Sequence, residues 1–98
     1  MSLLTALLDL EDAATYDGDT PYLTRDQVTS VLPFQLFTKT LGQLRTIEQG
    51  TRAEVKWEAR RGYGYLTVSI FETLSDGTLW TYSIRYTVTL NPTLTSTL

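Results

Sequence analysis

The first part of the chain has the apolar spacing of an amphipathic helix. Leu3, Leu7 and Leu10 recur at intervals of three and four residues, so they would lie on one helical face. Ser2 stands at the start of this segment and is a favourable N-cap residue. The pattern therefore predicts a helix over residues 2–15.

Turn-forming residues and a second capping pattern follow this helix. Residues 16–21 combine Asp, Gly and Pro and predict a loop. Thr24 and Gln27 have the spacing of a capping box, in which each side chain bonds the backbone of the other residue. We therefore predict a second, short helix over residues 25–32.

The segment before Gly50 has a less consistent pattern. From Phe34 to Ile47 the apolar residues keep helical spacing, and Gly50 suits the end of a helix. Several threonines and a glycine within the segment are poor helix formers. We predict a third helix here, so that the helical part covers about 2–49, and a strand within 35–48 is the alternative.

From residue 51 the period of the pattern changes to that of a strand. Apolar residues alternate with polar ones in three runs, which is typical of an antiparallel sheet with one buried and one solvated face. The predicted inward-facing residues are Ala53, Val55, Trp57 and Ala59, then Leu66, Val68 and Ile70, and last Trp80, Tyr82, Ile84, Tyr86, Val88 and Leu90. The three runs predict a meander over about residues 51–90.

Two turns fix the register of this meander if all inward-facing residues share one side of the sheet. A two-residue turn at 62–63 and a three-residue loop at 75–77, with its glycine in a left-handed conformation, satisfy that condition. In this register Trp57, Val68 and Ile84 form one row across the sheet. The outward-facing residues of the opposite, solvated side are then fixed as well.

These elements together predict an α+β fold in which N-terminal helices pack on one face of a three- to four-stranded antiparallel meander. The 98 residues suit one small domain, so we expect a single domain over residues 1–98, with a Pro- and Thr-containing tail at 91–98. No apolar stretch is long enough to cross a bilayer, and no basic residue precedes the first leucines. We therefore expect a cytoplasmic protein that does not bind membranes.

The absence of Cys and His narrows the possible chemistry. It excludes disulfides, zinc sites built from Cys and His, and catalysis by thiol or imidazole groups. The carboxylates that remain show no pair in surroundings that would separate two pKa values, as acid–base catalysis requires. We therefore expect no cofactor, no metal and no enzymatic activity.

Negative charge is concentrated near the N-terminus. The protein has eight basic and eleven acidic residues, a formal net charge of −3, yet residues 1–24 contain no base. Such a segment attracts a basic partner or imitates nucleic-acid phosphates, whereas a solvated helix end with an acidic loop is the simpler interpretation. The candidate partner-binding acids are Asp9, Glu11, Asp12, Asp17 and Asp19.

The last predicted strand is a second candidate for partner binding, because it is longer than its neighbour. Its end, over residues 85–90, would have backbone groups without a strand on one side, available for dimerisation or strand addition. The outward-facing residues there are Arg85, Thr87 and Thr89. A further strand from residues 35–48 or from the tail would cover this edge.

A hairpin rich in glycine and tyrosine points to an alternative partner. Residues 61–68 resemble the RNP1 octamer of RNA-recognition domains, in which an aromatic residue stands at the position of Val68. Residues 55–57 together with 62–66 resemble the first hairpin of cold-shock domains. Both resemblances imply a surface for single-stranded nucleic acid, with tyrosines stacking on bases and basic residues contacting phosphates. The residues concerned are Lys56, Arg60, Arg61, Tyr63 and Tyr65.

Large aromatic residues are the basis of a third hypothesis. Four of them are large for so small a core, and with Glu72 facing Trp80 they would form a pocket for a cationic or planar small ligand. Ordinary core packing is the simpler interpretation. The four residues are Trp57, Trp80, Tyr82 and Tyr86.

Without catalytic chemistry, the sequence favours a non-enzymatic protein–protein interaction module of the inhibitor, immunity, adaptor or assembly-subunit type. It would act through the acidic N-terminal segment, the sheet edge, or both, and a homodimer is one form of edge pairing. A single-stranded nucleic-acid-binding protein and a small-ligand carrier are the two alternatives.

Overall fold

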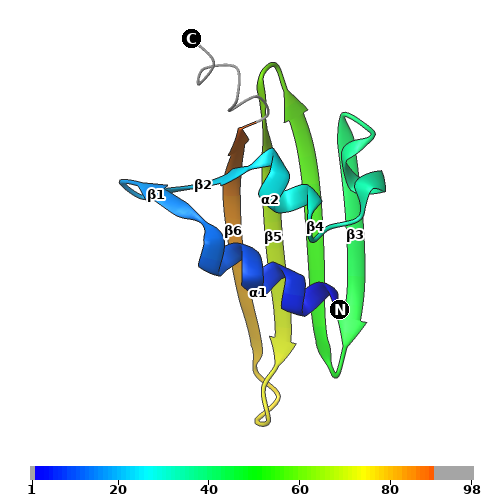
Figure 1. Cartoon of the computed structure of the whole chain (residues 1–98). Helices are drawn as coiled ribbons and strands as arrows, with labels where there is room; N and C mark the ends of the chain where they lie inside the picture. Colours follow the sequence, from blue (N-terminus) through cyan, green and yellow to red (C-terminus); the bar gives the residue numbers. More distant parts are fainter. Residues whose placement is uncertain (1, 90–98) are drawn as a thin grey trace.

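The structure is a computed structural model that describes residues 2–89, and its helices all lie on one side of a sheet (Figure 1). The elements in chain order are α1 (Leu3–Ala13), β1 (Thr15–Asp17), β2 (Thr20–Thr24), α2 (Arg25–Thr29), the 3-10 helix η1 (Phe34–Phe37), β3 (Leu41–Glu48), β4 (Thr51–Arg60), β5 (Tyr63–Thr73) and β6 (Leu79–Thr89). The predicted tail at 91–98 and the inward-facing Leu90 lie outside the described residues.

The sheet is mixed and six-stranded, with the strand order β1-β2-β6-β5-β4-β3. Neighbouring strands are antiparallel except β2 and β6, which run parallel. The predicted α+β fold, with N-terminal helices on a three- to four-stranded antiparallel meander, is therefore wrong. Within residues 2–89 only α1 is longer than two turns, and three strands lie in the part predicted to be helical, 2–49.

Residues 41–48 form a strand that pairs along its whole length with β4. The backbone of η1 approaches β3 so closely that a Cβ atom at Gly42 would lie 2.0 Å from the carbonyl oxygen of Leu36. Gln49 and Gly50 both have positive φ and form the tight turn that leads into β4. The third predicted helix is thus wrong except for the single turn of η1, and the alternative of a strand within 35–48 is confirmed.

The hairpin of β1 and β2 replaces most of the loop predicted over 16–21. Gly18 has a φ of +63° in its turn, a conformation that glycine adopts without strain. In β2, Pro21 and Leu23 are buried, and Leu23 lies opposite Val88 of β6. Such short strands have no periodic pattern of their own, so contact with the core fixes their position.

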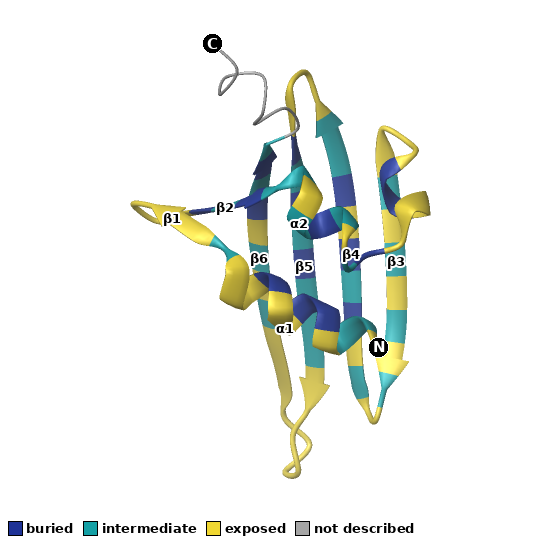
Figure 2. Ribbon diagram, in the orientation of Figure 1, coloured by how far each residue is buried: buried dark blue, intermediate teal, exposed yellow. Residues whose placement is uncertain are grey.

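The predicted starts of the first two helices are confirmed. Ser2 Oγ accepts a hydrogen bond from the backbone nitrogen of Thr5 at 3.1 Å, and Thr24 and Gln27 form the capping box. α1 and α2 end two and three residues earlier than predicted. Both helices bury their apolar side chains against the same face of the sheet, and dark blue bands in Figure 2 mark the buried residues of the strands.

The predicted register is correct between β5 and β6 but not between β4 and β5. Val68 lies opposite Ile84 as predicted, and the glycine of the 75–77 loop has positive φ. The turn between β4 and β5 is at 61–62, however, so Trp57 lies opposite Leu66 and the predicted row of Trp57, Val68 and Ile84 is wrong. A shift of two residues leaves every side chain on its predicted face.

The packing of Trp57 explains this shift. Its ring lies directly on Gly64 of the neighbouring strand and meets the ring of Phe37 edge-on at 5.0 Å. A residue with a side chain at position 64 would occupy the space of the indole. The core therefore selects the register that places a glycine beneath the largest buried side chain.

Candidate functional site

Part of β6 is a strand edge that no other strand covers within residues 2–89. β2 pairs with β6 only from Thr87 to Thr89, so residues 79–85 of β6, which we call the open edge, pair with β5 alone. Charged residues and prolines commonly protect a strand edge from pairing with other chains. Residues 79–84 contain neither. The open edge is therefore suited to pairing with a strand of another molecule.

The open edge lies earlier in β6 than the uncovered edge expected from the sequence. The pattern predicted uncovered backbone at residues 85–90, with Arg85, Thr87 and Thr89 facing outward. β2 pairs with β6 at Thr87 and Thr89, so this part is covered. Arg85 points away from the helices, and its Cζ atom lies 4.9 Å from the ring centre of Tyr65.

An apolar groove lies beside the open edge, on the side of the sheet that carries the helices. Trp80 and Tyr82 stack there with ring planes 2° apart and ring centres 6.0 Å apart. Leu8 of α1 is 51% exposed beside them, and Trp80 is 45% exposed. The groove has a volume of about 390 Å³ and is lined by Leu4, Leu8, Glu11, Thr51, Ile70, Glu72, Trp80 and Tyr82. Exposed apolar surface gathered in one place is typical of partner-binding sites.

Two carboxylates and no Lys or Arg line the groove in the part of the chain that the structure describes. Glu11 Oε2 accepts a hydrogen bond from the hydroxyl of Tyr82 at 3.0 Å. Burial raises the pKa of Tyr82, and the hydrogen bond to Glu11 raises it further. Glu72 lies opposite Trp80, as predicted. The groove thus combines apolar surface with negative charge.

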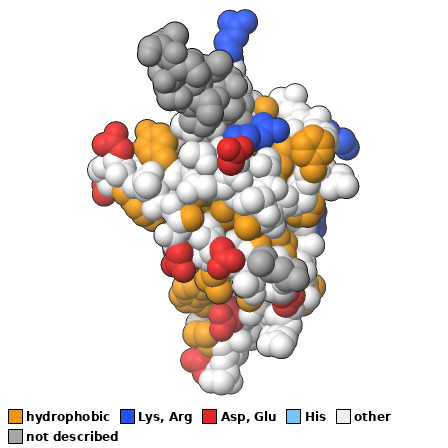
Figure 3. All heavy atoms as spheres, viewed as in Figure 1, with side chains coloured by type: hydrophobic (Ala, Val, Ile, Leu, Met, Phe, Trp, Pro, Cys, Tyr) orange, Lys and Arg blue, Asp and Glu red, His pale blue; other side chains and the backbone are white. Residues whose placement is uncertain are grey.

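The five acidic residues singled out in the sequence do not form one site. Glu11 reaches the groove, whereas Asp9 and Asp12 are exposed elsewhere on α1, and Asp17 and Asp19 lie in the hairpin of β1 and β2. Figure 3 shows acidic side chains spread over the lower and left parts of this side of the molecule, with basic ones near its upper end. Of the five, Glu11 is the one hydrogen-bonded to a side chain of the open edge.

Most residues of the glycine- and tyrosine-rich hairpin lie together on the other side of the sheet. Those that face away from the helices are Lys56, Arg60, Tyr63 and Tyr65. Arg61 lies in the turn. The two tyrosine rings meet edge-on at 5.4 Å. Glu58, rather than Arg60, lies opposite Tyr65, because the register of β4 differs from the predicted one by two residues.

The four aromatic residues of the hypothetical ligand pocket are divided between two environments. Trp57 and Tyr86 are buried in the core, and burial raises the pKa of Tyr86 above its ordinary value. Trp80 and Tyr82 line the open groove, where Glu72 accompanies them. Two of the four are therefore accessible to a ligand, and the other two have a structural role.

The contribution of α1 to the groove could not be predicted from apolar spacing. Leu4 and Leu8 flank the buried face of α1. In the sequence their spacing only widens the apolar stripe that is expected to pack in the core. The signal for the open edge was the absence of charge over 79–84. By contrast, β4 has a charged residue at every outward position from Arg52 to Arg60.

Neither the geometry of the acidic side chains, nor the helices, nor comparison with known proteins assigns a further function to the described residues. No group of three or more acidic side chains in the described part of the chain is placed to hold a metal ion. None of the helices within residues 2–89 is long and apolar enough to cross a membrane. Comparison of the chain with families of known proteins, with curated proteins and with solved structures found no match.

Proposed function

We propose that the protein is a non-enzymatic interaction module that binds an extended segment of a partner protein along the open edge. The segment would add a strand to the sheet, so that backbone hydrogen bonds give affinity. Because alternate side chains of a strand point to opposite faces, every second side chain of the segment would lie over the groove. The observation that carries this proposal is the stacked pair of Trp80 and Tyr82 within residues 79–84 of the open edge, which include no charged residue.

The charges around the groove favour a basic partner segment. Glu11 and Glu72 line the groove, and no cation among the described residues accompanies them. An Arg side chain over the groove would pack its aliphatic part on Trp80 and bring its guanidinium to a carboxylate. A suitable segment therefore has Arg and an apolar residue alternating at the positions that face the groove, and small polar residues at the positions between them.

A second copy of the chain is a less suitable occupant of the open edge. Two copies paired edge to edge would bring the carboxylates of Glu11 and Glu72 in one copy toward the same groups in the other. Like charges that face each other across an interface oppose association. We therefore expect a monomer in light scattering at neutral pH.

Fluorescence anisotropy with a designed peptide tests the proposal. A labelled peptide of Thr-Arg-Thr-Val repeats, about as long as the open edge, should bind, and replacing Arg by Glu should weaken it by about tenfold or more. Trp80→Ala should weaken binding by about tenfold or more, because an aromatic anchor is removed. Ile47→Ala, which truncates an exposed apolar residue of β3, is the control and should leave binding unchanged.

N-methylated versions of this peptide separate strand pairing from charge attraction. Methyl groups on every second backbone nitrogen remove the donors from one edge of an extended peptide and leave the other edge intact. We expect one of the two possible versions to lose binding and the other to keep it. Full binding by both, or no binding by the parent peptide, would show that no strand is added. A stable dimer that Trp80→Ala dissociates would assign the open edge to a second copy instead.

A further inference from the structure

The side of the sheet opposite the helices forms a second surface, which we call the outer face. No helix among the described residues covers it, and its side chains come from alternate residues of β3 to β6. Its charged residues are Arg45, Arg52, Lys56, Arg60 and Arg85, with Glu54 and Glu58. The outer face thus has an excess of three positive charges, although the net charge of the protein is −3.

The two glutamates of the outer face each pair with one arginine. Glu58 pairs with Arg60, and Glu54 pairs with Arg52 at 3.7 Å. Within residues 2–89, no carboxylate lies at ion-pair distance from the remaining three cations, which are Arg45, Lys56 and Arg85. These three charges are available to an anionic partner.

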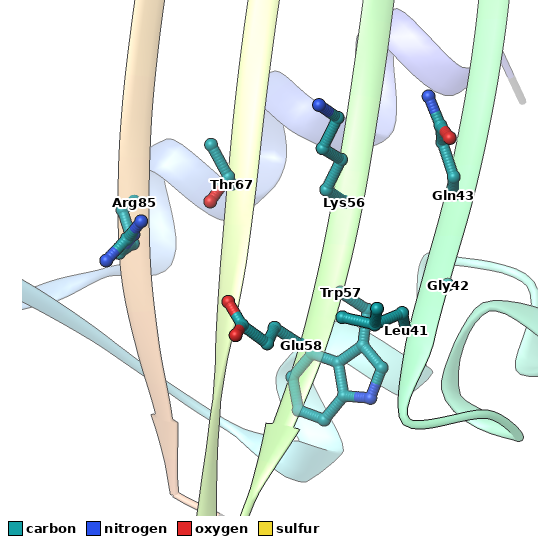
Figure 4. Close-up of a pocket in the computed structure, with 8 residues that line it drawn as sticks. All are labelled: Leu41, Gly42, Gln43, Lys56, Trp57, Glu58, Thr67 and Arg85. Carbon is teal, nitrogen blue, oxygen red and sulfur yellow. The ribbon is translucent and has the colours of Figure 1, made fainter.

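Two of the available cations belong to a row of hydrogen-bond donors that crosses four strands. Gln43, Lys56, Thr67 and Arg85 occupy neighbouring positions on β3, β4, β5 and β6. They line a shallow depression of about 430 Å³, which Figure 4 shows from the outer face with the helices behind the sheet. Neighbouring strands are about 4.8 Å apart, so the row is about 14 Å long. An extended anionic chain could contact it at more than one point.

Aromatic rings lie beside this row, and guanidinium groups flank them. The Cζ atoms of Arg85 and Arg60 lie 4.9 and 5.7 Å from the ring centre of Tyr65. Arg52 lies 4.4 Å from the ring centre of Phe71. Nucleic-acid bases stack on aromatic rings and on guanidinium planes alike. The outer face therefore offers flat surfaces for bases next to cations for phosphates.

We propose that the outer face binds single-stranded nucleic acid, with bases stacked at Tyr65 and phosphates at Lys56 and Arg85. A duplex keeps its bases paired and stacked within its own helix, so it would contact the cations without using the rings. A second copy of this positive surface would be repelled, and an acidic protein segment would satisfy the cations but not the rings. The site extends the glycine- and tyrosine-rich hairpin to Arg85 at the end of the open edge, and it lies on the opposite side of the sheet from the groove.

Fluorescence anisotropy at low salt tests this proposal with three labelled probes: an oligouridine, an RNA duplex of the same length and an oligoglutamate peptide. We expect the oligouridine to bind at least about tenfold more tightly than either of the others, because it alone engages both rings and cations. Lys56→Glu should weaken its binding by about tenfold or more. Lys39→Glu makes the same change of charge on an exposed residue between η1 and β3, outside the row of donors, and should have a much smaller effect.

A second pair of variants tests stacking separately from charge. Tyr65→Thr should weaken oligouridine binding by at least about fivefold, whereas Tyr16→Thr, which alters an exposed tyrosine of β1, should not. Circular dichroism establishes that each variant is folded, and Tyr63→Thr replaces Tyr65→Thr if the latter is not. No binding of oligouridine at micromolar protein, equal effects of Lys56→Glu and Lys39→Glu, or equal affinity for oligoglutamate would overturn the proposal.

Discussion

The core packs a tryptophan ring directly onto a glycine. A Cβ atom at position 64 would lie 2.1 Å from Cη2 of Trp57, and Trp57 is only 2% exposed, with Phe37 against its ring. Gly64→Ala should therefore lower the free energy of unfolding by about 1–3 kcal/mol, as overpacked core variants do, measured by urea denaturation.

A double-mutant cycle is the control for this contact. Trp57→Phe removes part of the indole that a methyl group at position 64 would meet, at the cost of a cavity. In the Trp57→Phe background, the further loss caused by Gly64→Ala should be smaller than in the natural protein. A urea midpoint for Gly64→Ala equal to that of the natural protein would contradict the contact.

Ionisation of the buried Tyr86 should make the protein less stable at alkaline pH. Its side chain is 1% exposed, and burial raises its pKa above the ordinary value of 10.0. A raised pKa means that the neutral form stabilises the folded state, so this contribution is complete below pH 10 and falls as pH rises further. The free energy of unfolding should then decrease by up to roughly 1.4 kcal/mol per pH unit per group.

Urea denaturation between pH 9 and about 11.5 measures this dependence. Tyr86→Phe should make the decrease above pH 10 shallower, because no ionisable hydroxyl remains in the core. Tyr82 contributes in the same direction, since burial raises its pKa as well. A decrease equally steep in the natural protein and in Tyr86→Phe would exclude Tyr86 as its source.

At the scale of the elements, the capping box determines where α2 begins. Thr24 Oγ1 accepts a hydrogen bond from the backbone nitrogen of Gln27 at 3.2 Å, and Gln27 Oε1 accepts one from that of Thr24 at 2.8 Å. Thr24→Ala should lower the free energy of unfolding by about 1 kcal/mol, the usual effect of losing an N-cap. Thr24→Ser keeps the hydroxyl and should retain most of the free energy of unfolding of the natural protein, measured by thermal or urea denaturation. Equal losses in both variants would show that the cap contributes nothing.

The elements that could be predicted from sequence are those with a complete apolar pattern. In β4 to β6 both the inward and the outward residues follow the period of a strand, so the faces were correct even where the register was not. β3 is an edge strand whose inward residues include Gly42, Thr46 and Glu48, so its buried side has little apolar signal. Its exposed Leu41 and Ile47 imitated helical spacing instead. β1 and β2 are too short for either period to appear.

The candidate site was predictable only in its separate parts. The acidic end of α1 and Glu72 facing Trp80 follow from local patterns, whereas the uncovered part of the last strand was expected at residues 85–90. The hydrogen bond between Glu11 and Tyr82 joins residues 71 positions apart, and it depends on how α1 crosses the sheet. The parallel pairing of β2 with β6 is likewise a long-range contact. It covers Thr87 and Thr89 and thereby moves the uncovered edge to residues 79–85.

For the whole molecule, the sheet separates charges of opposite sign. The outer face has five cations and two carboxylates, while the rest of the chain has three cations and nine carboxylates. The two proposed partners accordingly have opposite charge, a basic protein segment at the open edge and an anionic strand on the outer face. Each surface would repel the partner of the other.

Net charge and the open edge together determine how the molecule should self-associate. The sequence pI is about 4.7, and repulsion between molecules is weakest near that pH. We expect pairing through the open edge there, seen as an increase in hydrodynamic radius by dynamic light scattering. Thr81→Lys places a cation on the open edge and should suppress this association. Thr38→Lys adds the same charge at an exposed position away from the open edge, so equal association of the two variants would show that other surfaces are responsible.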